Sequence, residues 1–321
     1  MSQRILLTGA AGFVGLHMLA ALRAAFPTAQ LIAATRPQDS DGRILTHADA
    51  VVAFDLLDSP GIAACVARTA PDACVHLAAM ADVGASFGQA ELVWRANVDG
   101  TRALATALME APGAPVLIHA SSAEVYGLSF RAPLALDEMA LLQPANPYAA
   151  AKAASDVALG EMALRGLRVV RMRPLNHVGP GQSPRFAVAA FARQVARIAA
   201  GRQAPVIRAG ALNKARDFLD VRDVCAAYVA ALRMAPSLPA GSVFNLASGT
   251  PRLMSAVLDD LLRVAEVSAQ VETEPAVLRP LDLDRTSCRA DAARAQLGWA
   301  PAISWDATVA DVMAYWLAAE A

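Results

Sequence analysis

Tyr148 and Lys152 are the residues whose types and spacing most clearly suggest chemistry. They lie four positions apart in the stretch Asn-Pro-Tyr-Ala-Ala-Ala-Lys, from residue 146 to residue 152. Alanine strongly favours helix, so both side chains should emerge on one helix face, a turn apart. A phenol and an ammonium group placed in this way form a proton-transfer pair. Taken alone, the pair is equally compatible with a surface tyrosine beside a solvated lysine.

A serine-rich segment precedes this pair. A strand expected over residues 116–119 runs into Ala-Ser-Ser-Ala-Glu-Val-Tyr-Gly, residues 120–127. Open α/β sheets bind ligands at the carboxyl ends of their strands. The hydroxyl of Ser122 could therefore hydrogen-bond a substrate oxygen there, although a serine-rich turn after a strand is also common. With Tyr148 and Lys152 following, we predict that Ser122, Tyr148 and Lys152 are the catalytic residues.

A glycine-rich turn at the start of the chain predicts nucleotide binding. A short apolar strand over residues 3–8 is followed by three glycines spaced G-x-x-G-x-x-G and by an amphipathic helix to about residue 25. Backbone N–H groups and the helix dipole at such a turn can receive a pyrophosphate. The spacing departs from the G-x-G-x-x-G fingerprint, and tight turns also need glycine for structural reasons. The predicted contacts are Gly9, Gly12, Phe13, Val14 and Gly15.

The second strand, residues 30–34, predicts the choice of cofactor. It is followed by Arg36, and no Asp or Glu stands at its end to grip a ribose 2′-hydroxyl. An arginine at this place can pair with a 2′-phosphate instead. We therefore predict a preference for NADP(H), with NAD(H) possible. The alternative is that Arg36 is a solvated loop residue.

Further strands and helices complete an α/β pattern. A strand over residues 50–54 ends at Asp55 and Leu56, which could contact the adenine. A strand over residues 73–77 leads from Leu77 into Ala78 and Ala79, small residues that let a cofactor approach the backbone. A helix over residues 89–110 carries Asn97, whose buried amide needs partners. Strands are also expected over residues 167–173 and near residue 244, and two helices over residues 253–321. This alternation predicts a Rossmann-type doubly wound, mostly parallel sheet.

Composition excludes several other classes of protein. The chain has 28 basic and 29 acidic residues, a formal charge of −1, which gives no sign of a nucleic-acid or membrane surface. The four cysteines have no spacing typical of zinc or disulfide frameworks, so we expect buried reduced thiols and no metal site. The early first strand leaves no room for a signal peptide, and no apolar run approaches transmembrane length. We therefore expect a cytoplasmic protein.

One local charge imbalance suits a diphosphate substrate. From Arg173 to Arg216 the sequence holds eight basic residues and no acidic one. Such a cluster could bind a nucleotide-linked sugar, although about half of these residues are expected to lie on the surface. Just beyond it, Asp220 is expected to cap a helix that runs to about residue 234.

Eight motifs in order resemble the extended short-chain dehydrogenase/reductases. They are TGAAGFVG, HLAA, Asn97, SSAEVYG, NPYAAAK, RPLNHVGPGQ, RDFLDVRDV and LRP. The resemblance implies an NADP-binding Rossmann domain, residues 1–172 plus about 217–247. It also implies a smaller C-terminal α/β domain, about 173–216 plus 248–321, for the nucleotide sugar. A homodimer would form through the two long helices that contain Asn97 and Tyr148.

The resemblance also assigns roles to residues. It places Ser122, Tyr148 and Lys152 in catalysis, adds His177 to the cofactor contacts, and places Lys152 at the ribose hydroxyls. The predicted substrate contacts are Ser122, Asn176, Arg185, Arg216 and Arg279. In reduction of a sugar C4 ketone, Tyr148 would donate the proton and Ser122 would hold the same oxygen. The neighbouring Lys152 is expected to lower the pKa of Tyr148.

Within the family, NHVGPGQ with SPRFAVAAFARQ, and RDFLDVRDV, look most like reductases of GDP-4-keto-6-deoxy-D-mannose. This implies a product of GDP-D-rhamnose or of its C4 epimer, GDP-6-deoxy-D-talose. A GDP-mannose 4,6-dehydratase is the main alternative, because Glu124 stands where dehydratases keep a catalytic Glu. Against it, Ala123 replaces their neighbouring Asp or hydroxyl residue. A nucleotide-sugar 4-epimerase is a further alternative, and a non-catalytic NADP(H) sensor is another, which the intact Ser122, Tyr148 and Lys152 oppose.

Overall fold

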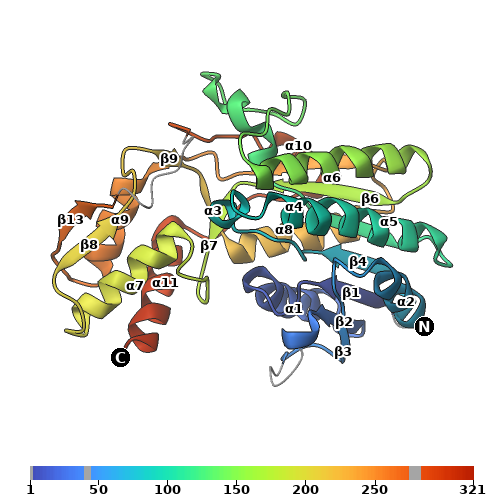
Figure 1. Cartoon of the computed structure of the whole chain (residues 1–321), viewed down its shortest axis with the longest axis horizontal. Helices are drawn as coiled ribbons and strands as arrows, with labels where there is room; N and C mark the ends of the chain where they lie inside the picture. Colours follow the sequence, from blue (N-terminus) through green and yellow to red (C-terminus); the bar gives the residue numbers. More distant parts are fainter. Residues whose placement is uncertain (1–2, 40–44, 275–282) are drawn as a thin grey trace.

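The computed structural model of the chain describes residues 3–39, 45–274 and 283–321. Its centre is a seven-stranded parallel sheet with the strand order β11-β6-β5-β4-β1-β2-β3 (Figure 1). The order reverses at β1, so β1 is the point where a doubly wound sheet opens a crevice for ligands. The predicted Rossmann-type fold is confirmed, with strand ends within about two residues of those expected. The strands are β1 (Arg4–Thr8), β2 (Gln30–Thr35), β3 (Ala50–Ala53), β4 (Ala73–His76), β5 (Val116–Ala120), β6 (Val169–Pro174) and β11 (Ser242–Leu246).

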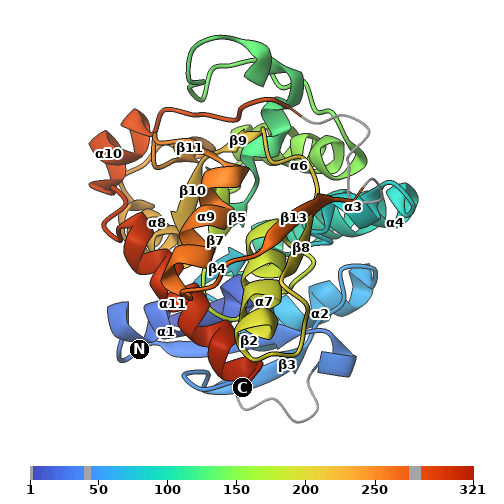
Figure 2. The same ribbon diagram turned by 90° about the vertical axis from the view of Figure 1, so that its left-hand side faces the viewer.

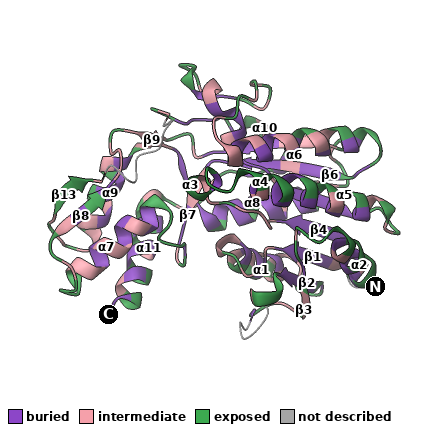
Figure 3. Ribbon diagram, in the orientation of Figure 1, coloured by how far each residue is buried: buried purple, intermediate pink, exposed green. Residues whose placement is uncertain are grey.

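Helices cover both faces of this sheet. Ile5 and Leu7 of β1 pack in one core with α1 (Phe13–Ala25) and α8 (Val221–Met234). Leu6, between them, packs on the other face with α2 (Ser59–Thr69), α5 (Thr101–Glu110) and α6 (Pro147–Leu164). Because successive strand side chains point to opposite faces, burial on both sides requires continuous apolar strands, as the sequence shows. Figure 3 shows the buried sheet and the exposed outer surfaces of the helices.

The helix predicted over residues 89–110 forms with an irregular centre. It consists of α4 (Ala90–Trp94), a π-helical segment η2 (Arg95–Gly100) and α5 (Thr101–Glu110). A short helix α3 (Val83–Ser86) precedes it. A π-helical segment rotates the side chains that follow it, and such segments are frequent at functional sites. Here it carries Asn97.

The helix that bears the candidate proton-transfer pair is α6 (Pro147–Leu164). It begins where it does because the Oδ1 of Asn146 accepts the backbone N–H of Ala149 at 2.8 Å, and because proline suits the first helical position. Before it comes the 3₁₀ segment η3 (Ala123–Arg131), which follows β5 directly. α6 lies beside α4 and α5 on the outside of the sheet (Figure 1).

A second group of elements lies beside the carboxyl edge of the sheet, as Figure 2 shows face-on. Its core joins α7 (Ala187–Ala199), α9 (Met254–Val264) and α11 (Trp305–Ala319) with β8 (Val206–Ala209), which pairs with β13 (Gln270–Thr273). Two small strand pairs connect it to the sheet: β7 (Asn176–Val178) with β10 (Phe218–Asp220), and β9 (Ala215–Arg216) with β12 (Arg252–Leu253).

The expectation of two helices after residue 253 is wrong, because the described residues there form three. The third, α10 (Asp291–Leu297), is only seven residues long and packs on α8, so its apolar pattern is too short to stand out. The predicted cap is confirmed: the carboxylate of Asp220 accepts the N–H of Arg222 at the start of α8.

The four cysteines are free and buried. Among the residues that the structure describes, no helix is both long enough and apolar enough to span a membrane. In the same residues, no group of three or more His, Cys, Asp or Glu side chains is placed to hold a metal ion.

Candidate active site

The loops after β1 and β4 meet at the carboxyl edge of the sheet. Gly9 follows β1 with φ +72°, a conformation that glycine adopts without strain. A Cβ at Gly9 would lie 2.7 Å from the backbone nitrogen of Ala78. The two loops can therefore approach this closely only because Gly9 has no side chain. The predicted cofactor residues Gly9, Leu77 and Ala78 are therefore brought together, although they are separated by about seventy positions.

The glycine turn has the shape that a dinucleotide pyrophosphate requires. Gly12 caps α1, and a glycine has no side chain to bond the first N–H groups of the helix, so these groups can bond a ligand. A Cβ at Gly15 would lie 2.6 Å from the carbonyl oxygen of Ala10, which shows how closely the helix packs on the turn. These residues fit the pyrophosphate of a nicotinamide dinucleotide.

An aromatic contact joins the start of α1 to β7, the short strand that follows β6. The ring of Phe13 stacks on that of His177, with 6.4 Å between centroids and 6° between planes. His17 adds a hydrogen bond of 3.0 Å from Nε2 to the carbonyl of Pro180. Burial lowers the pKa of His177, so its ring is neutral near neutral pH. Two predicted cofactor residues, Phe13 and His177, thus stack on each other.

The candidate contacts for the adenosine end lie on exposed loops. Arg36 follows β2 and pairs with Asp39 at 2.8 Å, with 65% of the arginine side chain exposed. Such an exposed pair contributes little and can open for a phosphate. Asp55 follows the neighbouring strand β3 and accepts the N–H of Leu57 at 2.9 Å. Leu56 packs against Gly100, and a side chain at Gly100 would collide with the carbonyl oxygen of Leu56.

The buried amide of Asn97 has the partners that the sequence required. Its Oδ1 accepts the N–H of Met80 at 2.8 Å, and its Nδ2 donates to the carbonyl of Met80 at 3.0 Å. Asn97 is fully buried. It therefore pins the loop that contains Ala78 and Ala79 to the π-helical segment.

Ser122, Tyr148 and Lys152 come together at the end of β5. Ser122 is 8% exposed and Lys152 is 4% exposed. The Oγ of Ser122 accepts the N–H of Glu124 at 3.1 Å and also interacts with the Tyr148 phenol. The Nζ of Lys152 donates to the carbonyl of Ala120 at 2.8 Å. A buried hydroxyl, a buried ammonium group and a half-buried phenol thus meet at the end of β5.

The expectation that Lys152 lowers the pKa of Tyr148 is not met. Burial raises the pKa of Tyr148 to about 12, helped by the charge of Glu124 and opposed by the Ser122 hydroxyl. Burial also lowers the pKa of Lys152 to about 8. Sequence spacing puts the two side chains on one helix face but does not report desolvation, which here outweighs the hydrogen bond with Ser122 that lowers the pKa of the phenol.

Asn146 is a site residue that the sequence reasoning left without a role. While its Oδ1 caps α6, its Nδ2 donates to the Oε2 of Glu124 at 3.3 Å. Asn146 therefore ties the start of the helix that carries Tyr148 to the segment that follows Ser122. An N-cap residue immediately before Pro147 is the sequence signal that could have identified it.

The predicted substrate contacts are distributed around the second group of elements. Asn176 begins β7, Arg216 ends β9, and Arg185 is exposed just before α7. Arg216 donates to the carbonyls of Ala215 and Leu283. Arg279 lies outside the described residues.

Much of the basic cluster between residues 173 and 216 has structural partners. Arg193 and Arg197 both pair with Glu320, and Lys214 pairs with Asp284. Arg173 is buried and forms an ion pair with Asp156. The sequence imbalance therefore overstates the positive charge that a substrate could meet, because the balancing acidic residues come from distant segments.

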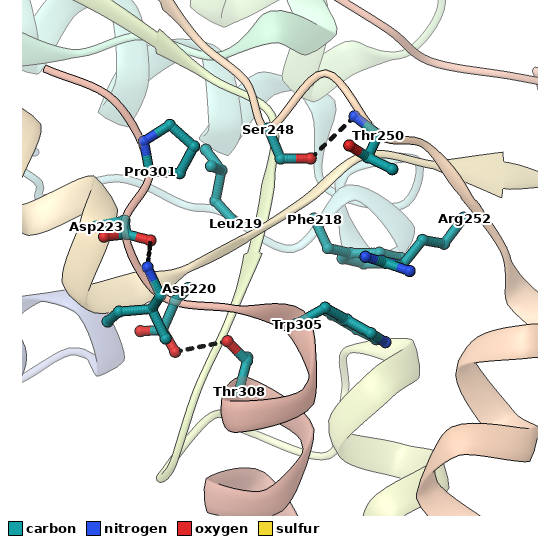
Figure 4. A pocket seen from close by; sticks show the side chains of 11 residues that line it. Phe218, Leu219, Asp220, Asp223, Ser248, Thr250, Arg252, Pro301, Trp305 and Thr308 are labelled. Atoms are coloured by element: carbon teal, nitrogen blue, oxygen red, sulfur yellow. Dashed lines mark hydrogen bonds between the residues drawn. The ribbon is translucent and has the colours of Figure 1, made fainter.

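A separate pocket of about 170 Å³ lies where α8 meets the loop before α11 (Figure 4). The guanidinium carbon of Arg252 lies 5.0 Å from the centroid of the Trp305 ring, which stacks on Phe218. Asp223 accepts two backbone N–H groups of that loop, those of Ala302 and Ile303. Of the described residues that line this pocket, none is a predicted site residue, and Asp223 there holds the loop onto α8.

Comparison with known proteins yields consistent relatives. A model of the NAD dependent epimerase/dehydratase family matches residues 5–247. GDP-6-deoxy-D-mannose reductase of Pseudomonas aeruginosa is 33% identical over 318 residues, which is 98% of each chain. A dTDP-glucose 4,6-dehydratase of Streptomyces niveus is 31% identical over 94% of this chain and 89% of that protein.

Solved structures extend the comparison to three dimensions. The structure of RMD from Pseudomonas aeruginosa complexed with NADPH superimposes with a TM-score of 0.84 at 30% identity, over 99% of this chain and all of that one. A UDP-glucose 4-epimerase of Thermus thermophilus in complex with NAD gives a TM-score of 0.85 at 27% identity, over 98% and 99% of the two chains. The relatives thus include reductases, dehydratases and epimerases.

Proposed function

The chain belongs to the NAD dependent epimerase/dehydratase family, and from this premise we propose that it reduces the C4 ketone of a nucleotide-linked 4-keto-6-deoxy sugar with NADPH. The proposed substrate is GDP-4-keto-6-deoxy-D-mannose, and the product is GDP-D-rhamnose or its C4 epimer GDP-6-deoxy-D-talose. One observation carries the chemistry: Ser122, Tyr148 and Lys152 meet at the carboxyl end of β5, where a phenol that keeps its proton at neutral pH lies beside a hydroxyl and an ammonium group. The similarity to the reductase of Pseudomonas aeruginosa supports the substrate class.

The residues of the carboxyl edge would hold the cofactor. Gly9, Gly12 and Gly15 leave room for its pyrophosphate at the start of α1, and Arg36 would pair with the 2′-phosphate of NADP(H). When bound, the nicotinamide supplies the hydride. Asp55 with Leu56 would contact the adenine, and the remaining proposed contacts, from Phe13 and Val14 to Leu77, Ala78, Ala79, Asn97 and His177, would line the path between the two ends.

Proton donation falls to Tyr148. Hydride transfer to C4 leaves negative charge on the ketone oxygen, and a nearby donor stabilises that charge as it develops. Because burial holds its pKa near 12, Tyr148 keeps its proton at neutral pH and can deliver it to this oxygen. Ser122 would hydrogen-bond the same oxygen. Lys152, on the same helix face, would supply positive charge and bind the ribose hydroxyls.

The proton donor does not distinguish reduction from the alternatives that begin with oxidation. A 4,6-dehydratase or a 4-epimerase first removes hydride from C4, and the same phenol would then accept the hydroxyl proton, because a group that donates a proton in one direction accepts it in the other. Two other observations favour reduction. Ala123 stands where related dehydratases carry Asp or a hydroxyl residue, and the chain is 33% identical to the reductase of Pseudomonas aeruginosa over 98% of each chain.

One observation keeps the dehydratase as a second candidate. Glu124 is close enough to Tyr148 for its charge to raise the phenol pKa, and Asn146 holds its carboxylate in place. A carboxylate there could act as the base of an elimination across C5 and C6. If the chain is a reductase, Glu124→Gln should change turnover only mildly, whereas it should abolish dehydration.

We further propose a cytoplasmic homodimer. Trp94 on α4 and Val157 and Leu164 on α6 are apolar side chains that are 44%, 57% and 89% exposed, and the two helices contact each other. Apolar residues of this size on neighbouring helices suit a symmetric interface. For the substrate, Asn176, Arg185, Arg216 and Arg279 would contact the diphosphate and its nucleoside.

One assay separates the reductase from the dehydratase. The purified protein is given NADPH and GDP-mannose, with and without a separate GDP-mannose 4,6-dehydratase that supplies the 4-keto sugar. We expect NADPH oxidation only when that enzyme is present, and product NMR then gives the configuration at C4. A keto sugar formed from GDP-mannose by this protein alone would contradict the proposal and establish the dehydratase.

A further inference from the structure

Three consecutive residues at the end of β5 meet three residues of α6 that are spaced four apart. The carbonyl of Ala120 accepts a hydrogen bond from the Nζ of Lys152 at 2.8 Å. The hydroxyl of Ser121 donates to the Oδ2 of Asp156 at 2.6 Å. Ser122, the third of the three, interacts with Tyr148. Residues 148, 152 and 156 lie on one face of α6 because four residues are close to one helical turn.

Asp156 is the most firmly held member of this set. Its side chain is fully buried and receives two hydrogen bonds from Arg173, from Nε at 2.9 Å and from an Nη at 2.7 Å. Arg171 adds a third at 3.0 Å and also donates to the backbone carbonyl of Asp156. Fork-shaped pairing of this kind fixes geometry as well as charge. Both arginines come from β6, so Asp156 locks α6 onto the strand beside β5.

The network continues into the segment that follows Ser122. Arg173 donates to the hydroxyl of Tyr126 at 2.9 Å, and that hydroxyl donates to the Oδ1 of Asn245 at 2.7 Å. Tyr126 lies in η3 and Asn245 in β11. Asp156 is therefore connected, directly or through Arg173, to the end of β5, to β6, to η3 and to β11. The bonds that join Asp156 to Ser121 and Arg173, and Tyr126 to Arg173 and Asn245, are buried, so water cannot substitute for them easily.

We propose that Asp156, with Ser121 and Arg173, is a positioning unit that sets the place of Tyr148 and Lys152 relative to Ser122. The inference rests on the proposed function and deepens it. Asp156 does not touch the reacting atoms. It acts through α6, and the short bond from Ser121 transmits its position to the strand end that carries Ser122.

The unit has an electrostatic consequence for Lys152. Burial lowers the pKa of Lys152, and the negative charge of Asp156 opposes that effect. The other ionisable groups coupled to Lys152 or Asp156 are His76 on β4, His119 on β5, and Arg171 and Arg173 on β6, while Tyr148 shares the helix face. Burial and the Lys152 charge hold the pKa of both histidines well below the usual range, so the histidines stay neutral.

The sign of the effect of Asp156 follows from these charges. Burial raises the pKa of Asp156, but the hydrogen bonds and the charge of Arg173 together lower it by more. Asp156 is therefore ionised at neutral pH. A carboxylate favours the protonated form of a neighbouring lysine. Replacing Asp156 by Asn therefore lowers the pKa of Lys152, and Lys152 loses its proton at a lower pH than in the unaltered protein.

The first experiment needs neither substrate nor cofactor. Lys152 and Lys214 are the two lysines of the chain, so a protein labelled with ¹³C at the lysine ε carbon gives two side-chain signals, assigned with Lys214→Arg. In Asp156→Asn we expect the titration midpoint of the Lys152 signal to move to lower pH by about one unit or more. Glu161→Gln, on an exposed pair of the same helix, is the control and should move nothing. An unchanged midpoint in folded Asp156→Asn overturns the proposal.

A second variant tests positioning without removing a charge. Ser121→Ala breaks the bond between Asp156 and β5 and leaves the ion pair intact, so the protein should fold even if Asp156→Asn does not. With the 4-keto sugar and NADPH, we expect kcat to fall about tenfold or more while KM for both ligands changes by less than about twofold. Ser121→Thr, which keeps a hydroxyl group at this position, should retain most of the kcat of the unaltered protein.

The outcomes distinguish the inference from the proposed function. A raised KM with normal kcat, or wild-type kinetics in Ser121→Ala, overturns the positioning role. If the unaltered protein oxidises no NADPH with any 4-keto sugar, the proposed function fails. The lysine titration then still decides whether Asp156 acts on Lys152.

Discussion

At the scale of single residues, Tyr148 carries the proposed chemistry because it keeps its proton at neutral pH and lies half-buried beside Ser122. Its phenol has a pKa of about 12, and burial is the largest cause. Replacing Tyr148 by Phe removes the hydroxyl and leaves the ring packing unchanged. The variant therefore separates proton donation from structure.

We expect Tyr148→Phe to lose turnover by a factor of about 10² to 10⁴, the usual contribution of a general acid. Its affinity for NADPH, measured by fluorescence titration, should stay within about twofold. Tyr315→Phe, on the exposed side of α11, is the matched control. Turnover near normal in Tyr148→Phe would exclude the phenol as proton donor.

Arg36 is the single residue that we expect to decide between NADP(H) and NAD(H). Its guanidinium is mostly exposed and is held by Asp39 alone among the described residues, so it is free to turn to a 2′-phosphate. Arg36→Ala should weaken NADPH binding by about tenfold to a hundredfold and leave NADH binding nearly unchanged, because a charge-assisted hydrogen bond contributes about 1.5–3 kcal/mol. Dissociation constants for both cofactors test this. Arg165→Ala, in an exposed pair on α6, controls for the loss of a surface charge, and equal losses for both cofactors would remove Arg36 from the 2′-phosphate.

At the scale of elements, the contact between the glycine turn and α1 sets how closely a pyrophosphate can approach. A Cβ at Gly15 would meet only backbone atoms, among them the carbonyl oxygen of Ala10 at 2.6 Å. Backbone cannot rotate away as a side chain can. Even one methyl group therefore has to separate the helix from the turn.

Gly15→Ala should lower the free energy of unfolding by about 1–3 kcal/mol, as overpacking does, and abolish measurable NADPH binding. Chemical denaturation and a binding titration give the two numbers. Gly88→Ala is the control, because its Cβ would meet nothing closer than 3.9 Å. Normal NADPH affinity in Gly15→Ala would show that the pyrophosphate binds elsewhere.

At the scale of the whole molecule, the outer surface of α4 and α6 governs assembly in the proposed dimer. A charge placed at Val157 would be buried without a partner in such an interface, which costs several kcal/mol. We expect Val157→Glu to be a monomer by light scattering at concentrations where the unaltered protein is a dimer. Val271→Glu, on β13 at the other end of the molecule, should leave the mass unchanged (Figure 1). A monomeric unaltered protein would contradict the dimer.

Local patterns in the sequence determined the alternation of strands and helices, the glycine turn and the helix that carries Tyr148 and Lys152. Strand and helix periodicity, capping residues and glycine positions act over a few residues, so a linear sequence records them directly. The predicted N-cap at Asp220 and the demand of Asn97 for partners were confirmed for this reason. The short helix α10 was missed because seven residues give too little periodicity.

The tertiary structure alone decided which groups meet and how they titrate. Arg173 counts as free positive charge in the sequence, but the fold places it on Asp156, and Ser121 reaches Asp156 from 35 positions away. The pKa of Tyr148 rises, although its spacing from Lys152 suggested a fall, because desolvation depends on every atom packed around the phenol. Burial and long-range pairing are properties of the folded chain, and no local pattern encodes them.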